Sequence, residues 1–204
     1  ALTEVGALLA GNCHRLTAVA LPPALHTLGE HAFVRCARLA TIDLSATALH
    51  HVGDHFLASC GTLVDVRLPA TLRSLGAASL AWCSALTVLD ASHTQLTEVP
   101  DCFLYYLPAL TSVALPPTVT GIGSRVLISC PALRAIDLSH TATEVVGDNF
   151  MNGCTALVDV RMPRSLRRLG ANAFTGCTAL AALRLEHTGL ESVGEHFVDD
   201  CGAM

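Results

Sequence analysis

Residues 154–163 read CTALVDVRMP, one copy of a pattern, C-x-x-L-x-x-[IVL]-x-[LM], that returns along the whole chain. The position of Cys154 recurs after 23 and 24 residues in strict alternation. The members of this column are Cys13, Cys36, Cys60, Cys83, Leu107, Cys130, Cys154, Cys177 and Cys201. A fixed period of roughly 20 to 50 residues is typical of a solenoid, in which each repeat forms one coil. We therefore predict one continuous solenoid domain over residues 1–204.

The order of residue types within a repeat predicts how each coil is built. The segment L-x-x-[IVL]-x-L alternates in the manner of a strand, and a second apolar pair follows it. A column of glycines comes next, interrupted by Pro100, and glycine there indicates a positive φ or a tight corner. A Phe or Leu stands shortly before each cysteine position. With a spacing of three, this residue and the cysteine would lie on one face of a short helical turn. We expect a right-handed α/β repeat solenoid with one parallel sheet of about eight strands, and short helical or 3-10 turns on the opposite side.

The repeats are of two alternating kinds. Short repeats of 23 residues carry a proline directly after the strand, at Pro22, Pro69, Pro116 and Pro163. Long repeats of 24 residues carry Ser or Glu there and a threonine two residues later, at Thr47, Thr94, Thr141 and Thr188. We expect these hydroxyls to satisfy backbone groups of the neighbouring coil, and Thr143, in an apolar position, to leave its layer under-packed. Val52–Pro69 closely resembles Val146–Pro163, 94 residues later, which indicates that a unit of four repeats was duplicated.

Composition narrows the class of partner. The net charge is −5, which argues against nucleic acid as the main partner. No apolar run reaches the 18 or so residues that cross a bilayer, so we predict no membrane insertion by this segment. Neither end carries an evident polar cap, and solenoids need caps, so we expect this chain to be part of a longer array. We expect a monomer, with end-to-end stacking of the open ends as the alternative.

The rear half of the repeat carries a family pattern, L-x-x-[IVL]-G-x-x-A-F-x-x-C-x-x-L. It is clearest in Ser165–Leu180 (SLRRLGANAFTGCTAL) and Ala24–Leu39 (ALHTLGEHAFVRCARL). The chain resembles the BspA-like (Treponema-type) class of leucine-rich repeat over essentially its whole length. That resemblance implies a surface protein of a bacterium or protist, active in adhesion or in binding host or partner proteins. It also implies motif residues that are structural, so we predict no enzyme.

Cysteine and histidine patterns do not predict a metal or cofactor site. Column cysteines on adjacent coils should have parallel Cβ vectors, which suits a disulfide poorly, so we expect buried free thiols. Cys102 lies outside the column and is the expected reactive thiol. There is no C-x-x-C pair, and His93, His140 and His187 recur 47 residues apart, too far apart to share one ion. We therefore expect surface histidines, no metal and no cofactor.

Two further surface features carry alternatives. Trp82, Tyr105 and Tyr106 fall near the outer turn and form either a small contact patch or stray surface rings. Arginines gather toward the C-terminal end and could meet an acidic partner or a sulfated glycan, or simply form a solvated basic patch. They are Arg161, Arg164, Arg167, Arg168 and Arg184.

The outward side of the predicted strands is the most informative surface. Acidic and basic side chains on adjacent strands would lie within reach of one another and form a ladder of ion pairs. Such a ladder either prevents like charges from stacking or forms a recognition face for a protein or glycan, as extended faces do in solenoids. The candidate residues are Asp43, Asp65, Arg67, Asp90, Asp137, Asp159, Arg161 and Arg184. The alternative function is a structural spacer that presents another domain and has no ligand of its own.

Overall fold

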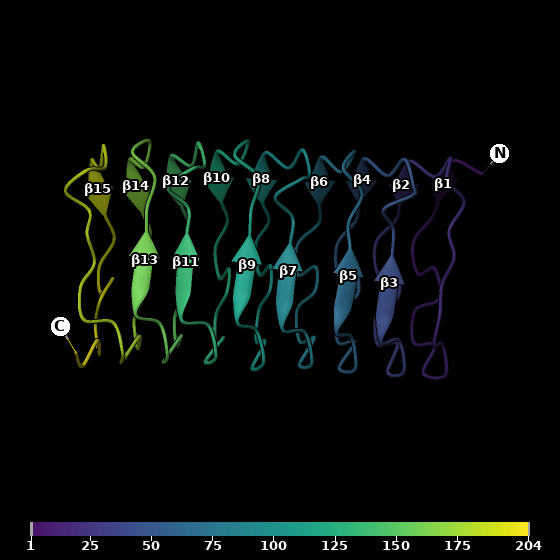
Figure 1. The fold of residues 1–204 in the computed structure, drawn as a ribbon, viewed down its shortest axis with the longest axis horizontal. Coiled ribbons are helices and arrows are strands. Elements are labelled where there is room, and N and C mark those ends of the chain that lie inside the picture. Colours follow the sequence, from purple (N-terminus) through teal and green to yellow (C-terminus); the bar gives the residue numbers. More distant parts are fainter. Residues whose placement is uncertain (1, 204) are drawn as a thin grey trace.

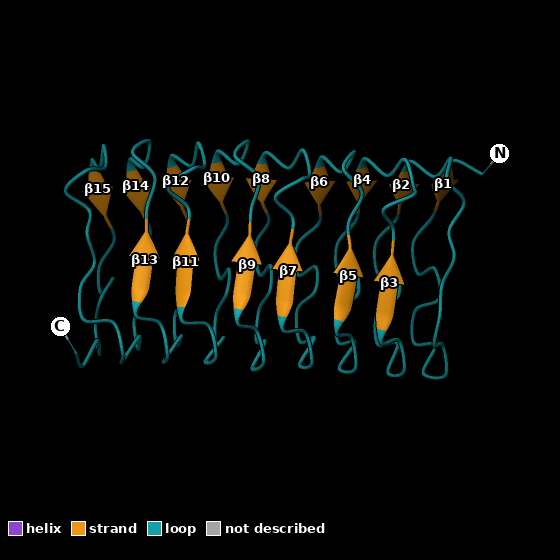
Figure 2. Cartoon of the chain, viewed as in Figure 1, coloured by secondary structure: helices purple, strands orange, loops and turns teal. Residues whose placement is uncertain are grey.

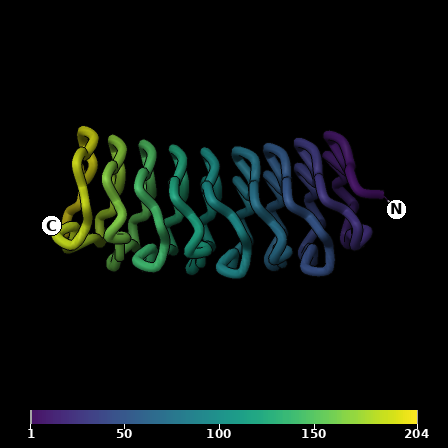
Figure 3. Tube along the Cα trace, turned by 90° about the horizontal axis from the view of Figure 1, so that it is seen from above, coloured from purple at the N-terminus to yellow at the C-terminus, as the bar shows by residue number. Residues whose placement is uncertain are grey.

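The chain forms a parallel β-solenoid of about eight turns, as predicted from the repeat period (Figure 1). The computed structural model describes residues 2–203. Successive coils lie side by side in chain order along one nearly straight axis, with the two termini at opposite ends (Figure 3). The predicted solenoid is therefore confirmed, while the predicted arrangement of its strands and turns needs three corrections.

The first correction concerns the sheet on one side, which we call the front. Six strands of three residues lie there, and they pair only two by two: β3 with β5, β7 with β9, and β11 with β13. Each pair joins a long repeat to the short repeat that follows it. The prediction of one sheet of about eight strands is wrong within the described residues, because the ladder stops between a short repeat and the next long one. The front strands are β3 (Thr41–Asp43), β5 (Asp65–Arg67), β7 (Val88–Asp90), β9 (Ser112–Ala114), β11 (Ala135–Asp137) and β13 (Asp159–Arg161).

The second correction is a further set of strands on the back, built from the apolar pair before the glycine column. These strands have two residues each and form two sheets, one of four and one of five strands (Figure 1). The back strands are β1 (Glu4–Val5), β2 (Thr27–Leu28), β4 (His51–Val52), β6 (Ser74–Leu75), β8 (Glu98–Val99), β10 (Gly121–Ile122), β12 (Val145–Val146), β14 (Arg168–Leu169) and β15 (Ser192–Val193).

The interruption of the back sheet coincides with a proline. In most other coils the glycine after the back strand donates its N–H to the strand of the preceding coil, as Gly53 does to Leu28 O at 2.9 Å and Gly123 to Val99 O at 2.8 Å. Pro100 occupies this position after β8 and has no N–H to donate. The sheet ends between β6 and β8, at the level of Pro100.

The third correction concerns the turns that close each coil. No helix is present in residues 2–203, so the predicted helical or 3-10 turns are wrong (Figure 2). Each turn instead alternates left-handed residues with others, as at Ala78 (φ 54°), Leu80 (φ 60°) and Trp82 (φ 59°). The N–H groups of Ala78 and Trp82 donate to the next coil and that of Leu80 to the preceding one, each at 2.8 Å. A helix would direct these donors along its own axis, so pairing between coils has replaced pairing within the turn.

The glycine column serves close stacking of the backbone. A Cβ on Gly147 would lie 2.7 Å from the carbonyl carbon of Gly123 and 2.7 Å from the backbone nitrogen of Ser124, in the preceding coil. Both contacts are shorter than real Cβ atoms tolerate. The predicted positive φ does not occur in this column, and the close approach of the preceding coil is the reason for glycine at Gly147. Positive φ occurs instead at Gly153 (φ 75°) and Gly176 (φ 73°), in the turns.

The core is one continuous stack of aliphatic and aromatic side chains with buried thiols along its turn side. The cysteine positions are more than apolar filler, because each buried thiol donates to a carbonyl of the preceding coil: Cys60 Sγ to Phe33 O and Cys154 Sγ to Leu127 O, both at 3.1 Å. All nine cysteines are free. Burial raises the pKa of Cys60 to about 12, so this thiol stays protonated and keeps its donor.

The threonines of the long repeats bond within their own coil, contrary to expectation. Thr47, Thr94 and Thr141 each donate to the carbonyl three residues earlier, at 2.7 to 2.8 Å. Thr143 is fully buried and donates to Val119 O at 3.3 Å, so its hydroxyl has an acceptor within the core. The backbone groups at these turns are thereby satisfied without water.

Candidate functional site

The outward side chains of the front strands form what we call the strand face. Seven of the eight candidate residues lie on it, and Arg184 stands at the equivalent position of the next coil, which forms no front strand. The eight fall into two sets of four, related by 94 residues. The first group is Asp43, Asp65, Arg67 and Asp90, and the second group is Asp137, Asp159, Arg161 and Arg184. Three aspartates and one arginine give the first group a formal charge of −2, whereas two of each make the second group neutral.

The arginine in the middle of each group makes two ion pairs. Arg67 lies 3.6 Å from Asp43 and 3.2 Å from Asp65, and the corresponding distances from Arg161 to Asp137 and Asp159 are 3.6 and 3.4 Å. The arginine side chains remain 64% and 63% exposed. No ion pair within the described residues joins Arg67 to Asp90, so the predicted ladder exists only inside each strand pair. Exposed pairs contribute about 0–1 kcal/mol each, which makes stability a weak reason for this arrangement.

The aspartate at the end of each long-repeat strand has a local structural role as well. Asp137 Oδ1 accepts from the Ser139 hydroxyl at 2.6 Å and from the Ser139 backbone N–H at 2.9 Å. Asp43 and Asp90 make the same two bonds to Ser45 and Ser92. The serine hydroxyl is the main reason why the pKa of Asp137 is lowered, and Arg161 contributes less. These aspartates end the strand, which leaves Asp65, Asp159 and the arginines freer to contact a partner.

Replacing Ser139 by Ala is expected to raise the pKa of Asp137 toward its ordinary value of 3.8. Because the folded-state pKa is lowered, the stability that this carboxylate contributes is complete above its ordinary pKa and is lost as the pH falls through the folded value. An NMR titration of the side-chain carboxyl carbons measures the shift. Arg161→Gln serves as the comparison, and a larger change with that variant than with Ser139→Ala would contradict the assignment.

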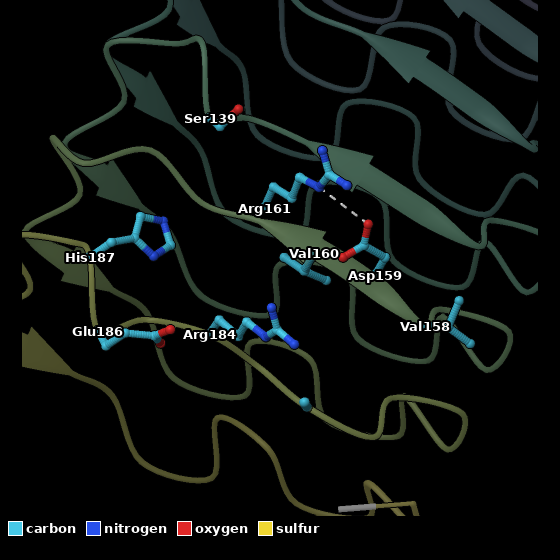
Figure 4. Close-up of a pocket in the computed structure, with 9 residues that line it drawn as sticks. Ser139, Val158, Asp159, Val160, Arg161, Arg184, Glu186 and His187 are labelled. Atoms are coloured by element: carbon cyan, nitrogen blue, oxygen red, sulfur yellow. Dashed lines mark ion pairs between the residues drawn. The ribbon is translucent and has the colours of Figure 1, made fainter.

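Open slots lie at two of the places where the front ladder stops. The first slot, about 360 Å³, lies between β5 and β7 and is lined by Val64, Arg67, Asp90 and His93 among others. The second slot, about 470 Å³, follows β13 and is lined by Val158, Arg161, Arg184 and His187 among others. Figure 4 shows Arg161 turned toward Asp159, and Arg184 lying beside Glu186 across the slot. Val64, Val88 and Val158 are about half exposed at these rims, so each slot combines an apolar edge with charged side chains.

The comparisons with known proteins agree with this architecture. A family model described as the BspA type leucine rich repeat region matches residues 3–134 and 97–204, in six copies. The chain belongs to the BspA-type leucine-rich repeat family. No sequence among curated proteins matches it.

Solved bacterial structures share the fold at low sequence identity. A leucine-rich repeat protein of Treponema pallidum is 22% identical with a TM-score of 0.59, over 95% of this chain and 81% of that one. One from Eubacterium ventriosum is 18% identical with a TM-score of 0.61, over 98% of this chain and 43% of that one. A leucine-rich cell surface protein of Faecalibacterium prausnitzii is 17% identical with a TM-score of 0.53, over 99% and 81%. At these identities the likeness shows the fold alone.

Histidines of the BspA-type long repeats bridge the openings in the front ladder, a role that sequence reasoning missed. The Nε2 atoms of His93, His140 and His187 donate to Leu68 O, Leu115 O and Met162 O, at 2.8 to 2.9 Å. Each accepting carbonyl directly precedes the proline of a short repeat. The spacing of 47 residues could have revealed this role, because a residue that recurs in every second coil always lies where a short repeat is followed by a long one.

Ala46 occupies the histidine position in the remaining long repeat, which provides a matched test. We expect Ala46→His to place a donor near the carbonyl of Leu21 and to stabilise the fold by about 0.5–1.5 kcal/mol. His140→Ala removes the corresponding bond and should destabilise by a similar amount. Chemical denaturation of both variants measures the two shifts, and equal signs for the two would contradict the assigned role.

The other predicted features concern a reactive thiol, a metal site, a membrane-spanning segment and the C-terminal arginines. Cys102 is partly buried, whereas Cys13 is exposed, so Cys102 is not the most accessible thiol. Within residues 2–203 no group of three or more His, Cys, Asp or Glu side chains is placed to hold a metal ion. The described residues also contain no helix long and apolar enough to cross a membrane. Of the C-terminal arginines, Arg167 pairs with Glu191 at 2.6 Å and Arg161 pairs with two aspartates, so neither is a free cation.

Proposed function

We propose that this BspA-type array is a protein-binding module that recognises a partner, as part of a cell-surface adhesion protein, through its strand face. The observation that carries the proposal is the duplicated arrangement of Arg67 and Arg161, each more than half exposed at the rim of an open slot with exposed valines. Arginine beside apolar surface is enriched where binding energy concentrates in protein interfaces. Membership of a leucine-rich repeat family supports interaction with proteins in general.

The two groups are similar without being interchangeable. They differ in formal charge at one position, where Asp90 corresponds to Arg184. They lie four coils apart, which is about 20 Å at the spacing of paired strands. A partner that contacts both groups must therefore present two patches at that separation, one more basic than the other. Engaging two groups at once multiplies affinity beyond that of either alone.

The test uses a panel of purified cell-surface and extracellular-matrix proteins, immobilised and probed with the whole chain. For any protein that binds, Arg67→Glu combined with Arg161→Glu is expected to weaken affinity about tenfold or more. The matched control is Arg73→Glu with Arg168→Glu, which makes the same change of charge beside or within the back strands. Equal losses with the two double variants would show general electrostatic attraction and overturn the proposal. Absence of binding to every member of the panel would favour the structural spacer.

A further inference from the structure

All the tryptophan and tyrosine of this chain gathers at one place on the turns. The chain contains one Trp and two Tyr. The rings of Trp82 and Tyr105 are 5.2 Å apart at an angle of 62°, and that of Tyr106 is 6.3 Å from Tyr105. Trp82 is 44% and Tyr106 is 53% exposed. These rings therefore leave large areas of apolar surface in water, on a different side of each coil from the strand face.

Packing does not account for the bulky residues at these positions. Trp82 and Tyr106 have left-handed backbone conformations, with φ of 59° and 62°. The same turn position in the other coils holds no aromatic residue; its occupants are Asn12, Arg35, Ser59, Ser129, Gly153, Gly176 and Asp200. Glycine adopts this conformation without steric cost, whereas a large side chain does not. An exposed ring gains little from the core in return, so these aromatic residues indicate a binding role.

The aromatic cluster lies in the middle of a groove. Trp82 and Tyr105 line a hollow of about 330 Å³ together with Arg125 and Asn149. Trp82 also lines a hollow of about 410 Å³ toward the N-terminus, and Arg125 and Asn149 line one of about 300 Å³ that spans three of the same coils. These hollows share lining residues, and the row that they form across several coils is what we call the groove.

Side chains alone would hold a ligand in this groove. The backbone N–H groups of Trp82, Tyr106, Arg125 and Asn149 all donate to the next coil, at 2.7 to 2.8 Å. An extended peptide therefore finds no free strand edge to pair with. The rim of the groove carries flat hydrogen-bonding groups, namely the Arg125 guanidinium, the Asn149 amide and the carboxylates of Asp101 and Asp148.

We propose that this groove binds a linear, uncharged oligosaccharide. A sugar ring has an apolar C–H face that stacks on an aromatic ring, and adjacent hydroxyls that match amide, guanidinium and carboxylate groups in pairs. Arg125 shares one hollow with the carboxylates of Asp101 and Asp148, which would repel a sulfated polymer, and Arg35 lines only the far hollow toward the N-terminus. The coils repeat every ~4.8 Å, close to the advance of one sugar in an extended chain, so successive sugars meet successive coils.

Fluorescence of the single tryptophan, Trp82, measures binding in the groove. Emission of Trp82 in the whole chain is titrated with hexasaccharides of glucose, mannose, xylose and N-acetylglucosamine, and with the corresponding monosaccharides. At least one hexasaccharide is expected to cause a saturable change, with at least about tenfold weaker binding of its monosaccharide because one ring fills one hollow. Tyr105→Ala and Asn149→Ala, which retain Trp82, should each weaken the hexasaccharide several-fold.

The controls separate this site from the strand face. Arg67→Glu with Arg161→Glu should leave the titration unchanged, and circular dichroism of each variant verifies the fold. No change of emission with any hexasaccharide at millimolar concentration, or unchanged binding by both Tyr105→Ala and Asn149→Ala, would overturn the proposal. A protein from the binding panel that changes Trp82 emission and loses affinity with Tyr105→Ala would assign the groove to a protein instead, and would also overturn it.

Discussion

Gly147→Ala is expected to destabilise the array by about 3 kcal/mol, because the added methyl meets the backbone of the preceding coil and not a side chain that can rotate. Its Cβ would lie 2.7 Å from both the carbonyl carbon of Gly123 and the nitrogen of Ser124. Relief would require the two coils to separate, which breaks the hydrogen bond from Gly147 N–H to Ile122 O at 2.8 Å. The midpoint of urea denaturation, followed by circular dichroism, measures the effect.

Gly61→Ala is the matched control for this prediction. A Cβ at Gly61 would find its nearest neighbour, the Ser84 hydroxyl oxygen, at 3.4 Å, and the residue is exposed. A change within about 0.5 kcal/mol is expected there, as for ordinary surface substitutions. If both variants shift the midpoint equally, the glycine column does not owe its identity to close stacking.

Phe174→Ala is expected to cost about 3–5 kcal/mol, and Phe174→Leu less than about 1.5 kcal/mol. The Phe174 ring is fully buried and packs edge-on against Phe150, with centroids 5.6 Å apart. Truncation to Ala leaves a cavity that the rigid coils cannot close. Leucine fills the same position in other short repeats, at Leu80 and Leu127, so the site accommodates its shape.

This prediction is tested by thermal and urea denaturation of the two Phe174 variants and of the unaltered chain. Because solenoid coils interact mainly with their neighbours, a local cavity could melt the C-terminal coils separately from the rest. A single transition shifted as a whole gives the stated free energies, and two transitions would place the loss in the coils around Phe174. Similar losses for Ala and Leu would contradict the cavity argument.

Sequence periodicity predicted the coil and its core well, because one buried face repeats in every turn. Leu157 and Val160, two of the aliphatic positions in the opening phrase, are both buried. The turns were predicted wrongly for a physical reason. A spacing of three between Phe174 and Cys177 fits a helical turn, but it fits equally a chain that alternates left-handed and other residues, and only the neighbouring coil selects between them.

The candidate site was predicted in its residues but not in its grouping. Asp43, Arg67 and their counterparts were identified as outward positions, and the structure places them on the strand face. The confinement of their ion pairs to single strand pairs depends on where the front ladder stops. That depends on bonds such as the one from His93 to Leu68, which joins side chain to backbone across coils and leaves no periodic apolar signal.

Both ladders are interrupted at one level of the rod, between the coil of β5 and β6 and the coil of β7 and β8. There the coils are joined by the core, by the turns and by a few loop bonds, such as that from Gln95 N–H to Leu72 O at 2.8 Å. We expect the array to bend most easily at this seam. Apart from the two ends, amide hydrogens should also exchange fastest there. The first slot lies at the seam and the second slot four coils away. The seam separates Asp43, Asp65 and Arg67 from Asp90, so bending there would change the spacing within the first group and the distance from Arg67 to Arg161.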